Sequence, residues 1–156
     1  MTRQKIKTCL WFDGDAQEAA EFYASVFKDR DNSGITDITP GPNGAALVVA
    51  FRLAGVDFLA LNGGPQYRFN EAVSLSVDCG SQEELDELWE KLSAGGSGGQ
   101  CGWLKDRYGL SWQIVPAVLP KLLAGADRGR ARRVLDALMG MTKLDIRALE
   151  AAADPA

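Results

Sequence analysis

The chain has 156 residues, of which 46% are hydrophobic and 24% are charged, a composition typical of a folded globular protein that excludes a disordered or fibrous one. The 17 Lys and Arg residues against 21 Asp and Glu give a net charge of −4, so no general attraction to nucleic acid or to an anionic membrane is expected. The apolar run Ala45–Phe51 is far shorter than the ~20 residues of a membrane-spanning helix, and the first residues do not read as a signal peptide. These features favour the cytoplasm.

The chain contains no histidine, which removes the commonest metal ligand and the commonest general acid or base. A Ser-His-Asp triad, a Cys-His dyad and any zinc or iron site that needs imidazole are therefore excluded. The three cysteines, Cys9, Cys79 and Cys101, are an odd number without a CxxC spacing, so they indicate neither a disulfide framework nor a zinc ribbon. We interpret them as buried free thiols in a reducing compartment.

The first part of the chain predicts one strand, one helix and three further strands. Residues 6–12 read as a buried strand that ends in a turn. Asp15 is expected to cap the next helix, with Glu18 in capping-box position. The strands predicted after this helix span residues 35–39, 45–53 and 56–61. The last two are joined by Ala54-Gly55, which is typical of a tight hairpin.

The same pattern starts again after residue 65. Residues 72–79 predict a strand, and Ser81 with Glu84 forms a capping box for a helix that ends at Gly95-Gly96. Shorter strands follow at residues 99–105 and 110–115. The order strand–helix–strands therefore occurs twice, and such a weak internal repeat indicates two like modules.

From Pro116 onward the pattern is helical. The predicted helices span residues 117–124, 128–139 and 145–153. The middle helix carries Arg128, Arg130, Arg132 and Arg133, which read as a solvated face or else as a surface for phosphate or an acidic partner. We expect a single domain over residues 1–153. Its parts are a module at 5–66, a module at 70–116 and a helical tail at 117–153.

Strand alternation assigns the two faces of each predicted sheet. Ser74 and Ser76 lie on the face opposite Leu75 and Val77, and Gln113 lies opposite Trp112 and Ile114. In the earlier strand, Leu59 and Leu61 lie opposite Phe58, Ala60 and Asn62, and we expect this second set to face away from the helix. The faces turned away from the helices are too apolar for bulk water and too polar for a helix-packed core. They predict a concave cleft for a small molecule, with a sandwich core as the alternative.

Three segments carry a family resemblance: CLWFDGDAQEAAEFYASVF, FLALNGGPQYRFNEAVS and QCGWLKDRYGLSWQIVP. They look like the PhnB-like branch of the glyoxalase/bleomycin-resistance superfamily, also called vicinal oxygen chelate. Members of that branch often carry the inherited label 3-demethylubiquinone-9 3-methyltransferase. The resemblance covers about residues 5–153. It implies an α+β glyoxalase-like fold of two βαβββ modules with a C-terminal helical extension.

The resemblance also bears on metal binding. In metal-dependent members a ligand sits on the first and last strands of each module, and the corresponding positions of this chain are Thr8, Ala60, Ala72 and Gln113. The first three are not plausible ligands, and one amide cannot hold a divalent ion alone. We therefore expect no metal, which argues against isomerase, dioxygenase and fosfomycin-type thiol transfer chemistry. No glycine-rich loop of the kind that most nucleotide-like cofactors use follows a strand, so no cofactor is predicted either.

The sequence thus predicts a metal-free glyoxalase-fold protein that binds a small, partly aromatic or apolar molecule in a cleft between the modules. The predicted ligand-binding residues are Thr8, Asn62, Ser74, Trp103 and Gln113. Trp103 follows a glycine-rich stretch that allows close approach of a ligand. No catalytic or metal-binding residue is assigned, and a homodimer without nucleic acid or membrane partners is expected.

Two alternatives stay open. One is a metal-independent enzyme with Cys101 as nucleophile and Lys105, Asp106 or Tyr108 as acid or base, although Cys101 has no histidine partner. The other is a dimeric structural or regulatory module with a vestigial cleft. In that reading a helix offering Leu135, Leu138 and Met139 provides the contact surface.

Overall fold

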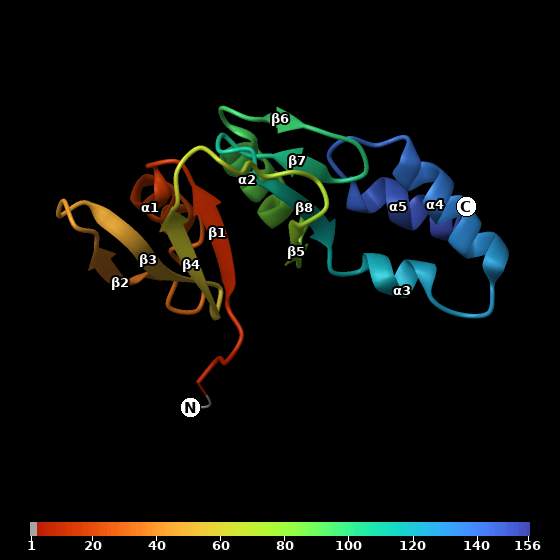
Figure 1. The fold of residues 1–156 in the computed structure, drawn as a ribbon. Coiled ribbons are helices and arrows are strands. Elements are labelled where there is room, and N and C mark those ends of the chain that lie inside the picture. Colours follow the sequence, from red (N-terminus) through yellow and green to blue (C-terminus); the bar gives the residue numbers. More distant parts are fainter. Residues whose placement is uncertain (1–2) are drawn as a thin grey trace. The chain divides into compact units, whose positions relative to one another are not determined.

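The computed structural model describes residues 3–156, and these fall into two compact units that divide between Phe69 and Asn70 (Figure 1). The first unit consists of β1 (Thr8–Phe12), α1 (Ala16–Val26), β2 (Gly34–Pro40), β3 (Ala46–Leu53) and β4 (Val56–Asn62). The second begins with β5 (Ser74–Cys79), α2 (Gln82–Ser93), β6 (Ser97–Gly98), β7 (Trp103–Lys105) and β8 (Ser111–Pro116). It ends with three helices, α3 (Leu119–Leu123), α4 (Arg128–Met139) and α5 (Ile146–Ala153).

The two units contain four-stranded sheets of the same connectivity. The strand orders are β1-β4-β3-β2 and β5-β8-β7-β6. In each sheet the first strand pairs in parallel with the last, and the other neighbours are antiparallel. The α+β class with two βαβββ modules and a C-terminal helical extension, which the sequence predicted, is confirmed.

An aromatic stack forms the core of the first unit. Tyr23 of α1 is fully buried and stacks on Phe51 of β3, with ring centroids 6.2 Å apart. Phe51 in turn stacks on Phe58 of β4 at 5.4 Å, and Ala60 is fully buried on the same face. The expectation that Phe58 and Ala60 face away from the helix is therefore wrong. Both faces of β4 carry apolar residues, so alternation alone could not tell which one the helix covers.

The turn and capping signals of the sequence were only partly correct. Ala54 and Gly55 have φ angles of 47° and 83°, as a two-residue turn with left-handed residues requires, so the predicted hairpin is confirmed. Ser81 caps α2 by accepting a hydrogen bond from the Glu84 amide at 3.2 Å, also as predicted. The predicted side-chain cap by Asp15 is wrong, because the Asp15 side chain makes no capping bond.

The second unit has an aliphatic core. Leu85, Leu88 and Leu92 of α2 are fully buried, and they face the sheet that contains Leu104, Trp112 and Ile114. The apolar spacing of the helix placed these leucines on one side in the sequence, and alternation placed Trp112 and Ile114 together in β8. For α2 and β8 the predicted faces and the observed ones agree.

The C-terminal helices pack against one another (Figure 1) and are tied to the second unit. Leu144, between α4 and α5, is fully buried, and the carbonyls of Met141 and Thr142 accept hydrogen bonds from the Cys101 and Gly102 amides at 2.8 Å. Arg133 from the basic cluster donates to carbonyl oxygens at the end of α5. Within residues 3–156, no helix combines the length and apolar character needed to cross a membrane.

Candidate functional site

Small and polar side chains gather on the face of the second sheet that is turned away from α2, which we call the open face. Its members are Ser74, Ser76, Trp103, Lys105, Ser111 and Gln113. In the strand register Gln113 lies opposite both Ser76 on β5 and Trp103 on β7, and Ser111 lies opposite both Ser74 and Lys105. Six residues from three strands thus form two adjacent rows on one surface.

A pocket of about 240 Å³ opens on this face. It is lined by Glu71, Ser97, Gly99, Trp103, Leu104, Lys105 and Ser111. Its wall combines an indole ring and aliphatic atoms with an ammonium, a carboxylate and two hydroxyl groups. Such a mostly apolar wall with a few polar groups is characteristic of small-molecule sites.

Ser111 is the most informative residue of this pocket. Its side chain is 1% exposed, and its hydroxyl oxygen has no hydrogen-bond partner among residues 3–156. Leaving a buried hydroxyl unpaired costs about 1–3 kcal/mol, so folded proteins seldom do it without a reason. A donor or acceptor supplied by a bound molecule would remove that cost.

An ion pair lies at the same pocket. The Lys105 ammonium contacts the carboxylate of Glu71, which lies before β5, and the hydrogen bond from Lys105 lowers the pKa of Glu71. Both side chains are well exposed, so the pair adds little stability by itself. Lys105 lies directly opposite Ser111 in the register of β7 and β8.

The structure brings together three of the five predicted ligand-binding residues. Gln113 donates from Nε2 to the Ser74 hydroxyl oxygen at 2.9 Å, and Trp103 lies opposite Gln113 in the register. Thr8 and Asn62 belong to the first unit, where they share the face of β1 and β4 that α1 covers. Thr8 is exposed at the start of β1, while Asn62 lies where β4 ends.

The Asn62 amide holds three elements of the first unit together. Its Oδ1 accepts a hydrogen bond from the Ala16 amide at the start of α1, and its Nδ2 donates to the Ala46 carbonyl in β3, both at 2.9 Å. A side chain from β4 therefore takes the capping position that Asp15 was expected to fill. A role for Asn62 in ligand binding stays a prediction.

We expect Asn62→Ala to lower the free energy of unfolding by about 1–3 kcal/mol, because it leaves a helix amide and a strand carbonyl unpaired. Urea unfolding measures this loss. Asp15→Ala is the matched control and should change stability by less than about 0.5 kcal/mol, since its side chain makes no capping bond. Equal losses in both variants would contradict this assignment.

The residues at the family's metal-ligand positions do not form a donor set for a divalent ion. Ala60 is fully buried and Ala72 is exposed, and neither has a side-chain donor atom. Gln113 already donates to Ser74. Within the described part of the chain, no three His, Cys, Asp or Glu side chains are grouped closely enough to hold a metal ion.

Three of the residues proposed for metal-independent catalysis make other contacts in the structure. The Cys101 thiol lies 3.7 Å from the Met139 sulfur, whereas Lys105 contacts Glu71. Asp106 is 2% exposed and accepts hydrogen bonds from two backbone amides and from the Trp112 indole. Asp106 thus organises the turn before β8.

Among the pocket residues that sequence reasoning missed are Ser111 and Glu71. Ser111 shares the strand face of Gln113, so its orientation was visible in the alternation of β8, but its burial without a partner was not. Glu71 precedes β5 in a segment with no periodic pattern. Its contact with Lys105, 34 positions away, has no signal in the sequence.

A family model and several solved structures match this chain. A family model described as 3-demethylubiquinone-9 3-methyltransferase matches residues 4–115. It thus includes the two βαβββ modules almost to the end of β8 and none of the C-terminal helices. No curated protein matches the chain in sequence.

Several solved structures share the fold. One is a Bacillus cereus PhnB protein named as a putative 3-demethylubiquinone-9 3-methyltransferase, with 34% identity and a TM-score of 0.67 over 73% of this chain and 100% of that chain. A Pseudomonas aeruginosa protein is 19% identical, with a TM-score of 0.59 over 73% of this chain and 98% of its own. The fosfomycin resistance protein FosX from Listeria monocytogenes, in complex with Mn(II) and sulfate, is 18% identical, with a TM-score of 0.52 over 72% and 90% of the two chains.

Proposed function

Because the chain belongs to the 3-demethylubiquinone-9 3-methyltransferase family, in the PhnB-like form of the glyoxalase fold, we propose that it binds a small organic molecule on the open face of the second sheet, without a metal ion. The observation that carries the proposal is the buried Ser111 hydroxyl, which lines the pocket and has no partner among residues 3–156. The absence of histidine from the chain supports binding without a metal.

The pocket wall suggests which ligand it fits. Trp103 offers an aromatic surface on which a planar or apolar group can stack. Ser111 offers a hydroxyl that can donate or accept one hydrogen bond, and Lys105 can pair with an anionic or carbonyl group in place of Glu71. We therefore propose a partly aromatic compound with at least one oxygen substituent.

Ser111→Ala tests the proposal because it should raise the free energy of unfolding if the hydroxyl serves ligand binding, and lower it if the hydroxyl stabilises the fold. Removing an unpaired buried hydroxyl should raise the free energy of unfolding by up to about 1 kcal/mol, measured by urea unfolding. Native mass spectrometry of the purified protein should show a small organic adduct on the wild type and less of it on the variant. Destabilisation together with an unchanged adduct would contradict the proposal.

Ser76→Ala is the matched control for this experiment. Ser76 lies on the same face and is exposed, so its loss should leave stability within about 0.5 kcal/mol. Gln113→Ala should weaken the adduct and leave stability nearly unchanged, since the bond to Ser74 is half-buried rather than part of the core. If the wild type carries no adduct, binding is tested instead by adding a panel of aromatic carbonyl compounds and measuring the change in Trp fluorescence. The absence of a fluorescence change with every compound counts against the proposal.

We also propose that the protein is a homodimer located in the cytoplasm. Leu135 and Met139 on α4 are 40% and 67% exposed, so they support a role for this helix as a contact surface. Only Cys79 is buried, whereas Cys9 is exposed and Cys101 is partly exposed, so the predicted burial of all three cysteines is wrong. Their free thiols support a reducing compartment. The same native mass spectrum measures the oligomeric state, and a purely monomeric mass at micromolar concentration would contradict the dimer.

A further inference from the structure

A second cavity, of about 590 Å³, lies in the first unit and is lined mainly by the segment that precedes β1. Its lining residues are Arg3, Gln4, Lys5, Lys7 and Leu59. Residues 3–12 carry three cations and no acidic residue, in a chain whose net charge is −4. The cavity is therefore a local concentration of positive charge on a protein that is acidic overall.

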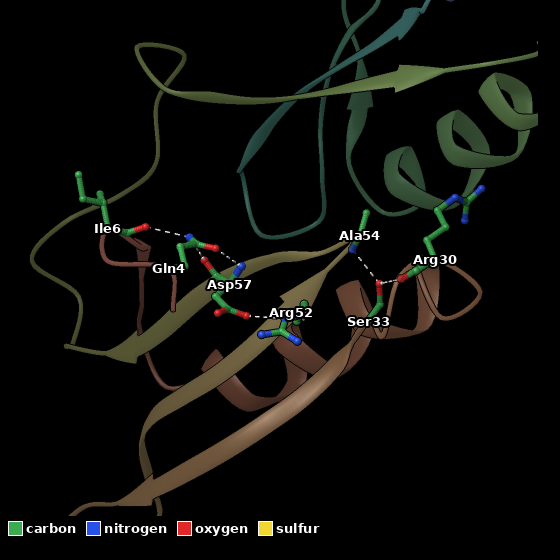
Figure 2. A network of polar contacts seen from close by, with 7 residues as sticks. All are labelled: Gln4, Ile6, Arg30, Ser33, Arg52, Ala54 and Asp57. Carbon is green, nitrogen blue, oxygen red and sulfur yellow. Dashed lines mark hydrogen bonds and ion pairs between the residues drawn. The ribbon is translucent and has the colours of Figure 1, made fainter. Parts of the chain in front are cut away.

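The Gln4 carboxamide anchors this segment to the start of β4 (Figure 2). Its Oε1 accepts a hydrogen bond from the Asp57 amide at 2.9 Å, and its Nε2 donates to the carbonyls of Asp57 at 3.1 Å and Ile6 at 2.8 Å. The backbone that carries the three cations is thus held in place before any ligand binds. A preorganised wall lowers the ordering cost of binding.

Asp57, whose backbone is bonded to Gln4, has a carboxylate that is already compensated. The Asp57 carboxylate accepts a hydrogen bond from Arg52 Nε at 2.6 Å (Figure 2), and this bond, with a smaller contribution from Lys7, lowers the pKa of Asp57. No ion pair links Arg3, Lys5 or Lys7 to an acid within the described residues. The positive charge of the cavity is therefore available to an anion from solution.

The remaining wall of the cavity is apolar. Leu59 is half-buried and lies on the face of the first sheet that is turned away from α1, beside Cys9 on β1 and Ala50 on β3. Partial burial raises the pKa of the Cys9 thiol, so this neighbour carries no charge near pH 7. A ligand that reaches Leu59 thus meets apolar or neutral atoms beyond the three cations.

We propose that this cavity binds an organic acid, with the carboxylate among Arg3, Lys5 and Lys7 and an apolar body against Leu59. Three cations within one cavity attract a single carboxylate more strongly than an isolated surface lysine does. Contact with Leu59 adds a contribution that a bare inorganic anion cannot obtain. The cavity shares no lining residue with the pocket that contains Ser111.

Titration of the full-length protein with octanoate, followed by the NMR shifts of backbone amides, tests the proposal. Octanoate should shift the amides of Lys7, Cys9 and Leu59, and its apparent affinity should fall as the salt concentration rises. The neutral analogue 1-octanol and inorganic phosphate should each bind more weakly than octanoate. If 1-octanol binds as tightly, the cations have no role, and if phosphate binds as tightly, the apolar wall has none, so either result overturns the proposal.

Variants of the lining residues locate the site. Lys5→Gln combined with Lys7→Gln should weaken octanoate binding about tenfold, the effect expected for the loss of two cations of which one is exposed and one half-buried. Lys28→Gln combined with Lys121→Gln is the control, because it changes the net charge equally at exposed positions outside the cavity. Equal affinities for the two double variants would overturn the proposal, as would shifts confined to residues 70–156.

Gln4→Ala tests whether octanoate binding depends on the anchored segment or only on the positive charge of its side chains. It retains all three cations but removes the two hydrogen bonds that hold their segment to Asp57 and the local bond to Ile6. We expect it to weaken octanoate binding about threefold or more, since ordering the segment then becomes part of the binding step. Unchanged affinity would overturn the claim that the anchored segment forms the site.

Discussion

Asp106→Ala is expected to lower the free energy of unfolding by about 3–5 kcal/mol, a larger loss than that expected for Asn62→Ala. The Asp106 side chain is 2% exposed, and its Oδ1 accepts hydrogen bonds from the amides of Tyr108 at 2.9 Å and Leu110 at 3.0 Å. Its Oδ2 accepts from the indole Nε1 of Trp112 at 2.9 Å. Alanine leaves three donors without a partner, two of them in bonds that are fully buried. Urea unfolding followed by fluorescence measures the loss.

Asp106→Asn keeps the shape of the side chain and should lose less, about 1–3 kcal/mol. Its remaining carbonyl oxygen can still accept hydrogen bonds from the two backbone amides. Its NH2 group then faces the Trp112 indole N–H, and because both groups are donors, the hydrogen bond to Trp112 is lost. Asp78→Ala, at an exposed position of β5, is the control and should stay within about 0.5 kcal/mol of the wild type. If Asp106→Ala behaves like Asp78→Ala, Asp106 does not organise this turn.

Leu144→Ala is expected to cost about 2–5 kcal/mol, because Leu144 is fully buried between the C-terminal helices and the rest of the second unit. Its side chain lies so close to Gly102 that a Cβ added there would meet Leu144 Cγ at 3.0 Å. The Leu144 carbonyl also accepts a hydrogen bond from the Gln82 amide group at 3.0 Å. Removing the isopropyl group therefore opens a cavity where the extension joins α2 and the loop before β7.

Leu135→Ala is the matched control, since it deletes the same atoms at a position of α4 that is 40% exposed. It should cost less than about 1 kcal/mol. A single unfolding transition for Leu144→Ala, shifted to lower urea concentration, is expected if the extension and the second module unfold together. Equal midpoints of urea unfolding for Leu144→Ala and Leu135→Ala would mean that the C-terminal extension does not unfold cooperatively with the second module.

The candidate site was predictable in part. Ser74, Trp103 and Gln113 could be placed on one surface because strand alternation and the repeated module fix which side chains share a face. The amino-acid sequence itself shows the cluster of Arg3, Lys5 and Lys7. The cavity, however, depends on the hydrogen bonds from Gln4 to Asp57, which is 53 positions away. Contacts between distant residues arise from packing, which a single sequence does not record.

The sequence by itself determined the fold class, the repeated module and the absence of imidazole chemistry, because these depend on residue periodicity, turn chemistry and composition. Only the tertiary structure decided which face of β4 the helix covers, since both of its faces are apolar. It also decided that Asn62 caps α1 in place of Asp15, and that the Ser111 hydroxyl is buried without a partner in residues 3–156. Hydrogen-bond satisfaction is a property of all the neighbours in space, whereas capping and alternation rules consider only neighbours along the chain.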